Sequence, residues 1–283
     1  MSSDDPTPRT TTIDRPAPTR RRALALLGGG SIAAVLAACS SDSDATSSST
    51  TSTTDAAGSG TSTSTTAVAA TGTGDADCDV TTPEETGGPY PADGTNGPNV
   101  LTQDGVVRQD ITSSFGEYSG AAAGVPLQID LRVLDSGAGC APLAGAALYL
   151  WHADQEGRYS LYSNGVTDQN YLRGVQVAGD DGTLRFTSVF PGCYDGRWPH
   201  IHFEVYETRA AATSGRNAIL TSQIALPESA DVDVYATSGY EDSVTNLSRT
   251  SLESDMVFSD GADAQLPTVS GDAGSGVTIQ LDV

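Results

Sequence analysis

The alternation of apolar and polar residues predicts a series of short β-strands in the C-terminal two thirds of the chain. Side chains alternate over residues 125–135, as in a strand with one buried face, whereas residues 146–151 (AALYLW) are apolar on both faces and predict a central strand. Further strands are expected at residues 183–189, 200–206, 217–224 and 276–283, and a short helix around residues 247–255. Gly-, Pro- and Asp-rich turns separate these segments, so the fold class expected is all-β: a single β-sandwich of mixed and antiparallel sheets with long loops.

The first 38 residues have the pattern of an export signal. Three arginines at 20–22 precede an apolar run, residues 23–38, that is too short to span a bilayer, which needs about 20 residues. Paired arginines indicate the twin-arginine route. The ending Leu-Ala-Ala-Cys39 is similar to a bacterial lipobox, which implies that Cys39 is lipidated and anchors an exported protein to the outer face of the membrane. The alternative is ordinary cleavage that discards Cys39.

Residues 39–77 are expected to form a disordered tether between this signal and a domain at 78–283. In residues 40–66, 19 of 27 positions are Ser or Thr, which cannot form a hydrophobic core. Three cysteines remain after Cys39: Cys78, Cys140 and Cys193. Outside the cytoplasm two of them can pair, and the sequence leaves all three pairings open.

The charge balance excludes nucleic acid as a partner. The formal charge is −22, all 14 basic residues are arginine, and from Cys39 onward nine Arg face 33 Asp and Glu. Such a chain repels phosphate backbones and anionic surfaces.

Candidate chemistry concentrates between residues 151 and 223. The chain has only three histidines, His152, His200 and His202. On a strand, His200 and His202 share a face and lie about 7 Å apart, so both can bind one metal ion. A solvated pair on a strand edge is the alternative. His152 follows a tryptophan at a strand end and is expected to be a structural hydrogen-bonding residue.

Tyrosines near these histidines favour ferric iron. Tyr194 lies six residues before His200, and Tyr159 follows the central strand, where it competes with Tyr162 and Tyr171. A phenol ionises near neutral pH only when a strong Lewis acid replaces its proton. Two phenolates and two imidazoles therefore favour Fe(III), because two anionic donors stabilise the higher charge.

Five segments resemble the intradiol ring-cleavage dioxygenases, a family of non-haem Fe(III) enzymes. They are WHADQEGRY (151–159), DDGTLRFTSVFPGCY (180–194), RWPHIHF (197–203), TPEETGGPY (82–90) and LTSQ (220–223). The resemblance implies that the iron ligands are Tyr159, Tyr194, His200 and His202. It implies an active-site arginine at Arg197, an active-site glutamine at Gln223, and a pocket that includes Tyr90 and Trp198.

The resemblance also implies an activity. The family cleaves catechol-type aromatics between the two hydroxyl-bearing carbons with O2, giving cis,cis-muconate-type diacids. Tyr194 would act as a base, Arg197 would stabilise developing charge, and Gln223 would orient the ring. Trp198 stands where the best-known members have proline, and the connection from Tyr194 to His200 is shorter, which leaves the substrate open. The alternative function is a surface-anchored metal- or aromatic-binding module without turnover.

Overall fold

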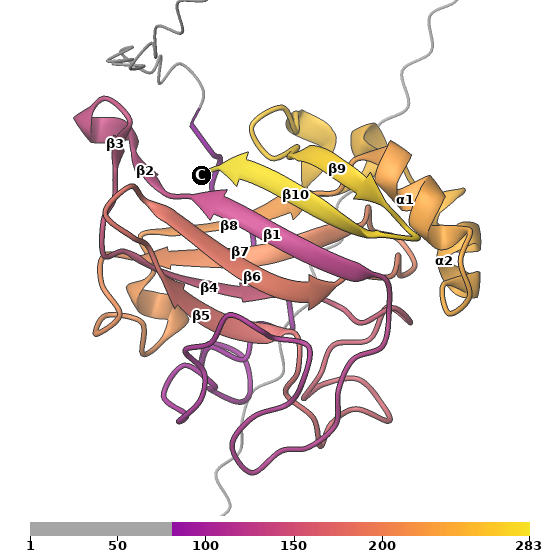
Figure 1. Cartoon of the computed structure of the whole chain (residues 1–283), viewed down its shortest axis with the longest axis horizontal. Helices are drawn as coiled ribbons and strands as arrows, with labels where there is room; N and C mark the ends of the chain where they lie inside the picture. The colour runs from indigo at the N-terminus through magenta and orange to yellow at the C-terminus, as the bar shows by residue number, and fades with distance from the viewer. Residues whose placement is uncertain (1–80) are drawn as a thin grey trace, which may run out of the picture. The chain divides into compact units, whose positions relative to one another are not determined.

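The computed structural model describes residues 81–283, whose main strands form two four-stranded sheets (Figure 1). The first sheet has the order β6-β1-β10-β9, with β1 (Pro126–Arg132), β6 (Thr183–Val189), β9 (Thr268–Asp272) and β10 (Gly276–Asp282). The second has the order β5-β4-β7-β8, with β4 (Ala147–Trp151), β5 (Arg173–Val177), β7 (His200–Tyr206) and β8 (Leu220–Ala225). Strands β1 and β10 pair in parallel and the other pairs of these sheets are antiparallel, so the predicted mixed β-sandwich is confirmed.

One apolar core joins the two sheets. Leu127 and Ile129 of β1 pack in the same buried cluster as Ile201 and Phe203 of β7, and each of the four is at most 1% exposed. Burying side chains of this size contributes about 1.5–3 kcal/mol each. The core therefore fixes which face of β7 turns inward, and its other face turns toward the loops.

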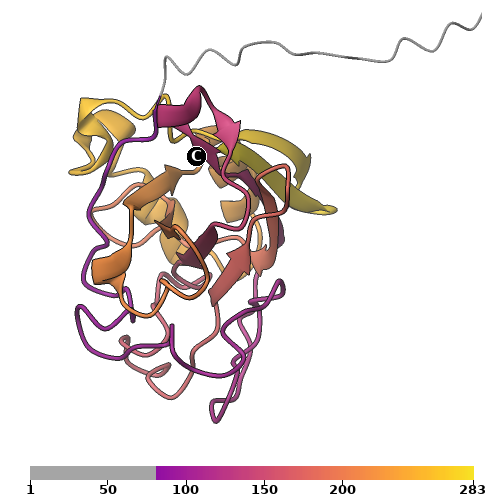
Figure 2. The ribbon, with the colours of Figure 1, turned by 90° about the vertical axis from the view of Figure 1, so that its left-hand side faces the viewer.

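A second buried cluster lies on that other face of the β5-β4-β7-β8 sheet. Tyr149 and Trp151 of β4 and Tyr206 of β7 pack there against residues from the 92–115 segment and against Tyr159. The start of the described chain runs along one side of the domain in Figure 2. We call residues 81–92 the N-terminal strap; the Glu85 amide donates to the Thr221 carbonyl of β8 over 2.7 Å, which fixes the strap to the sheet.

The strand predictions agree with the structure best where the alternation is strict. Residues 183–189 and 200–206 are strands β6 and β7 as expected. The expected strand at 125–135 divides into β1 and β2 (Leu134–Asp135), and β2 pairs with β3 (Ala141–Pro142). The strand expected at 217–224 starts only at Leu220, because residues Gly215–Asn217 form the 3-10 turn η2.

The prediction of a helix over residues 247–255 was wrong. The helices are α1 (Glu228–Tyr235) and α2 (Glu241–Leu247), and only the 3-10 turn η3 (Leu252–Ser254) lies within the expected range; a further 3-10 turn, η4, covers Phe258–Asp260. The hydroxyl of Ser251 accepts from the Ser254 amide and begins η3 as a separate turn, which ends the continuity with α2. A last 3-10 turn, η1 (Ser136–Ala138), joins β2 to β3.

Several predictions concern residues outside 81–283. These are the signal peptide at 1–38, the tether at 39–77, and Cys39 and Cys78, and they stay predictions. Within the described residues no helix is long and apolar enough to cross a membrane. Cys140 is disulfide-bonded while Cys193 is a free buried thiol, so the pairings that include Cys193 are excluded.

Candidate metal centre and active site

Strand β7 presents two imidazoles on one face. Because side chains alternate along a strand, His200 and His202 point away from the core residues Ile201 and Phe203. Their Nε2 atoms lie 3.1 Å apart, and each residue is 3% exposed. Nδ1 of His200 donates to the Trp198 carbonyl, so the lone pair of its Nε2 faces the other imidazole.

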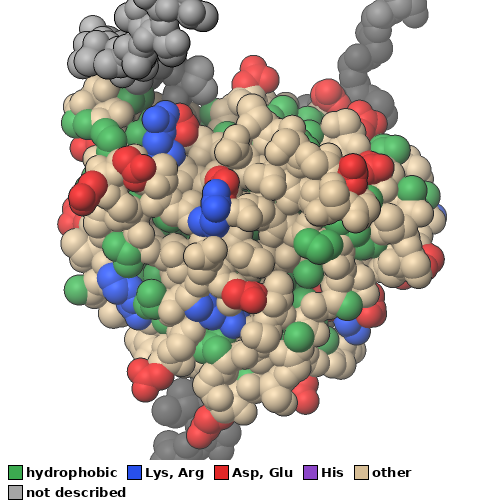
Figure 3. All heavy atoms as spheres, viewed as in Figure 1, with side chains coloured by type: hydrophobic (Ala, Val, Ile, Leu, Met, Phe, Trp, Pro, Cys, Tyr) green, Lys and Arg blue, Asp and Glu red, His purple; other side chains and the backbone are tan. Residues whose placement is uncertain are grey.

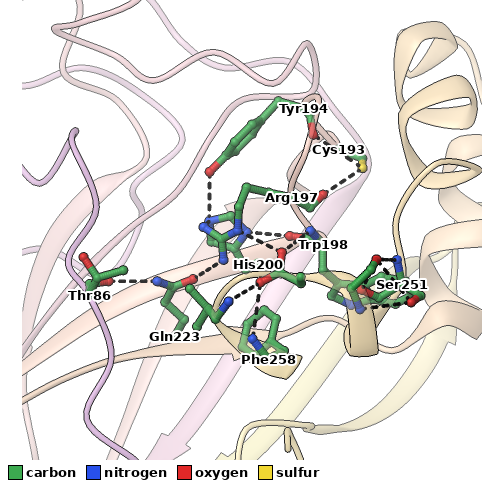
Figure 4. Close-up of polar contacts among 12 residues, drawn as sticks. Thr86, Cys193, Tyr194, Arg197, Trp198, His200, Gln223, Ser251 and Phe258 are labelled. Atoms are coloured by element: carbon green, nitrogen blue, oxygen red, sulfur yellow. Dashed lines mark hydrogen bonds and ion pairs between the residues drawn. The ribbon is translucent and has the colours of Figure 1, made fainter. Parts of the chain in front are cut away.

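Two tyrosines from different loops complete this set of atoms. Tyr159 lies in the loop after β4 and Tyr194 in the loop before β7. The phenol oxygens of Tyr159 and Tyr194 lie 3.3 and 3.1 Å from Nε2 of His200, and 3.5 Å from each other. Figure 4 shows the ring of Tyr194 reaching toward His200, with Arg197 beside it. Four donor atoms from residues 159–202 thus meet in one place.

A glycine permits the close approach of the two loops. Gly157 has φ +77° and a Cβ there would lie 3.0 Å from Cβ of Tyr194. The Gly192 amide also donates to the Asp154 carbonyl over 2.9 Å. The backbone therefore helps to hold the loops of Tyr159 and Tyr194 together.

The donor set fits a metal ion that accepts phenolate. Ligands about 2.0–2.2 Å from a common metal lie roughly 3 Å from one another. The distances from Nε2 of His200 to the other three donor atoms, 3.1–3.3 Å, agree with this spacing. No group of three or more His, Cys, Asp or Glu suited to a metal exists among the described residues, so the phenols are indispensable to any site here. A hard trivalent ion such as Fe(III) suits this mixture of oxygen and imidazole donors.

Burial sets the protonation of these candidate ligands. Burial and the charge of Arg197 lower the pKa of His200 to about 3, and burial lowers the pKa of His202 well below its ordinary value. Burial raises the pKa of both Tyr159 and Tyr194. Both imidazoles are therefore neutral near pH 7, and both phenols keep their protons until a Lewis acid displaces them.

A chain of hydrogen bonds places Arg197 beside the donor atoms. Its NH1 lies 3.4 Å from Nε2 of His200, its NH2 donates to Oε1 of Gln223 over 2.7 Å, and its Nε donates to Oδ2 of Asp255 over 2.8 Å. Nε2 of Gln223 donates in turn to the Thr86 carbonyl of the strap over 2.8 Å (Figure 4). The structure thus brings Arg197 and Gln223 together at the predicted ligands.

Two residues of this hydrogen-bond chain were not predicted from the sequence. Asp255 is 1% exposed and lies 58 positions after Arg197, without a local pattern that connects them. Thr86 contributes only its carbonyl oxygen, which any residue type possesses. The TPEETGGPY segment gave the one available signal that the strap approaches the site.

The remaining tyrosines do not join the donor set. Tyr171 donates to Oδ2 of Asp154 and Tyr162 donates to the Asn96 carbonyl. The Tyr90 ring lies 5.0 Å from the ring of Tyr159, and its predicted pocket role stays a prediction.

Trp198 and His152 lie in the interior. Trp198 is 5% exposed and its indole N–H donates to the Leu226 carbonyl, and its predicted pocket role also stays a prediction. His152 lies 2.7 Å from the Ser188 hydroxyl and 2.8 Å from the Ala153 carbonyl, which confirms a structural hydrogen-bonding role.

Parts of the sequence are similar to known dioxygenases. The family model described as "Dioxygenase" matches residues 96–210. A chlorocatechol 1,2-dioxygenase from Rhodococcus opacus is 39% identical over 54 residues, and a hydroxyquinol 1,2-dioxygenase from a Rhizobium species is 38% identical over 63 residues. These segments are 19% and 22% of this chain. The described domain is related to the intradiol ring-cleavage dioxygenases.

The structural likeness extends beyond the matched sequence. An intradiol ring-cleavage dioxygenase from Tetranychus urticae has the same fold, with a TM-score of 0.56 and 24% identity over 71% of this chain and 92% of that one. The two sequence matches each span 21% of the relative's own length. The comparisons therefore show that this domain has the fold of an intradiol ring-cleavage dioxygenase and resembles dioxygenases in sequence over residues 96–210.

Proposed function

We propose that this protein is a non-haem Fe(III) intradiol dioxygenase that cleaves a catechol-type aromatic between its two hydroxyl-bearing carbons. O2 supplies two oxygen atoms, and the product is a cis,cis-muconate-type diacid. The observation that carries the proposal is the convergence of Tyr159, Tyr194, His200 and His202 beside Arg197 and Gln223. Fe(III), when bound, would supply Lewis-acid activation of the diol toward O2.

The protein's own groups divide the remaining work. Tyr194 is the more exposed of the two phenols, and we assign its oxygen as the base that takes a proton from a substrate hydroxyl. The guanidinium of Arg197, 11% exposed, is held beside the site and stabilises negative charge that develops on the ring oxygens. Gln223, fixed on one side by Arg197 and on the other by Thr86, would orient the ring.

The surface charge favours an uncharged or weakly charged diol. Asp and Glu side chains are scattered over the face drawn in Figure 3 instead of gathering in one patch. The long-range field of an acidic protein disfavours the approach of polyanions. We therefore expect catechols without carboxylate groups to have the higher kcat/KM.

Oxygen uptake on a panel of catechols tests the proposal. Iron-loaded wild type should consume O2 with at least one catechol, and the Tyr194→Phe variant should be much slower on the same substrate. Equal uptake by the two proteins would contradict the assignment of Tyr194 as the base. Binding of iron and catechols without any uptake would instead favour a binding module without turnover.

We also propose that the protein is exported and lipid-anchored at Cys39. Support comes from the sequence of residues 20–39. In a host with this export route, wild type should fractionate with membranes and Cys39→Ala should not. An unlipidated wild-type protein would contradict the anchor and leave the proposed activity untouched.

A further inference from the structure

Arg173 is a buried cation outside the set of candidate active-site residues. It is the first residue of β5, is 0% exposed, and is in register with Trp151 of β4, whose ring stacks on His202 with centroids 4.9 Å apart. No ion pair includes Arg173 among the described residues, so a buried charge stands here without a carboxylate partner. Such a charge is costly unless hydrogen bonds compensate it.

Each nitrogen of the Arg173 guanidinium donates to a neighbour. Nε donates to the Ser160 hydroxyl over 3.0 Å, and NH2 to the Ser160 carbonyl over 3.0 Å and the Tyr90 carbonyl over 2.9 Å. NH1 donates to the Pro91 carbonyl over 3.0 Å and the Tyr149 hydroxyl over 3.2 Å. These five contacts use the full donor capacity of a guanidinium.

Four of the five contacts are made to two segments that meet at the donor set, and the fifth is made to Tyr149 of β4. Ser160 follows Tyr159 directly, and both its carbonyl and its hydroxyl are held by Arg173. The Tyr90 and Pro91 carbonyls belong to the strap, and the Tyr90 ring contacts the Tyr159 ring at a centroid distance of 5.0 Å. One side chain therefore ties the Tyr159 loop and the strap to the sheet that carries the histidines.

We propose that Arg173 is the positioning residue for Tyr159: it holds the Tyr159 loop and the strap in the placement that aims the phenol oxygen of Tyr159 at the metal site. This inference rests on the proposed function, since the phenol oxygen matters through the ion it binds. Lysine cannot replace arginine here, because an ammonium has three N–H donors on one atom while the five acceptor contacts are spread over three nitrogens.

The test separates the two phenolates spectroscopically. Full-length protein is loaded with Fe(III), and its visible tyrosinate charge-transfer band is recorded. The substitution Arg173→Lys is made in three backgrounds, namely wild type, Tyr194→Phe and Tyr159→Phe, and each band is compared with that of the same background without the substitution. In Tyr194→Phe only the Tyr159 phenolate contributes, and Arg173→Lys should shift or weaken that band. In Tyr159→Phe only Tyr194 contributes, and the band should not change. Iron affinity should fall about 10–100-fold in the backgrounds that keep Tyr159.

Arg209→Lys is the matched control for a purely structural loss. Arg209 also donates to backbone carbonyls, those of Ala212 and Leu101, and neither of these residues belongs to the Tyr159 loop or the strap. The control variant should lower thermal stability without moving the charge-transfer band. In metal-free protein, hydrogen exchange at the Leu161 and Ala92 amides should rise in Arg173→Lys and stay unchanged in Arg209→Lys.

The outcomes distinguish this inference from the proposed function. A wild-type protein without a charge-transfer band would contradict the metal site itself. A wild-type band that Arg173→Lys alters equally in both tyrosine backgrounds would overturn the role of Arg173 alone. If Arg173→Lys does not fold, Ser160→Ala removes one of the acceptors of Arg173 and should give the same pattern with smaller changes; no difference between the two backgrounds would again overturn the inference.

Discussion

Nε of Arg197 donates to Oδ2 of Asp255 over 2.8 Å, and the Asp255 side chain is fully buried. The same oxygen accepts from the Trp198 amide over 2.7 Å. Asp255 thus fixes both Arg197, the proposed active-site arginine, and the backbone that leads into β7. Burial alone would raise the pKa of Asp255, but donation from Arg197 and from backbone amides outweighs it and lowers the pKa below its ordinary value.

The first prediction concerns Asp255→Asn. It should cost on the order of 3 kcal/mol of stability at pH 7, because Arg197 loses its buried counter-charge. It should also lower kcat/KM on the order of 100-fold through misplacement of the guanidinium. Chemical denaturation and steady-state kinetics measure the two effects, with Asp260→Asn, an exposed carboxylate nearby, as the control.

The pH dependence of this variant has a definite sign. The folded pKa of Asp255 is depressed, so its stabilisation is present above the unfolded value of 3.8 and is lost as the pH falls through the folded pKa. The stability gap between wild type and Asp255→Asn should therefore close in acid. A gap that is constant from pH 7 to pH 3 would contradict the ion-pair account.

The second prediction concerns Asp231 of α1. It is 0% exposed, and neither carboxylate oxygen has a hydrogen-bond partner among the described residues. Burial raises its pKa well above the ordinary value, so folding loses stability as the pH rises from 3.8 toward the folded pKa. The stability of Asp231→Asn relative to wild type should rise by about 1.4 kcal/mol per pH unit in that window. Thermal melts of the metal-free proteins between pH 4 and pH 8 measure it; a relative stability independent of pH would show that Asp231 titrates normally.

The third prediction has the opposite sign and concerns His152. Burial lowers its pKa to about 4 from 6.5, so the unfolded chain binds the extra proton and stability falls as the pH drops from 6.5 toward 4. His152→Gln removes that dependence. The stability of the variant relative to wild type should therefore rise as the pH falls, and melts of the same metal-free proteins at pH 7 and pH 5 would detect it. A relative stability that falls on acidification would be inconsistent with a neutral buried His152.

The fourth prediction concerns Gly88 in the strap. Its φ is +67°, and a Cβ there would lie 3.3 Å from Cε1 of His202. Gly145 also has positive φ, at +79°, but a Cβ there meets no atom within 4 Å. Alanine should cost about 1–2 kcal/mol at either position through backbone strain. Only Gly88→Ala should also weaken iron binding, as measured by competition with a chelator; equal affinities of the two variants would mean that the strap does not constrain His202.

The local parts of this site were predictable from the sequence. A strict alternation over 200–206 determines that the two histidines share a face and that Ile201 and Phe203 turn toward the core. The motif around Tyr194 and the spacing from Trp151 to Tyr159 carried the resemblance from which the candidate ligands were predicted. Both signals are local: each spans only a few consecutive residues, over which strand geometry determines the direction in which the side chains point.

The parts that could not be predicted depend on distant segments. Strand β5 was missed because Gly174 and the charged Arg173 interrupt any apolar pattern, and only the fold shows that Arg173 is buried under two loops. The contact of Asp255 with Arg197 depends on a 3-10 turn that no periodicity indicates. The roles of Arg173 and Asp255 depend on contacts with residues far away in the sequence, and no local sequence pattern indicates those contacts.

Product analysis under 18O2 tests the central claim most directly. The iron-loaded protein is incubated with the best substrate of the catechol panel, and the product is identified by mass spectrometry. We predict a ring-opened cis,cis-muconate-type diacid that contains both atoms of one O2, with one O2 consumed per diol. A product cleaved beside the diol, a product with one labelled oxygen from O2 in the absence of exchange, or an intact ring would contradict intradiol dioxygenase activity.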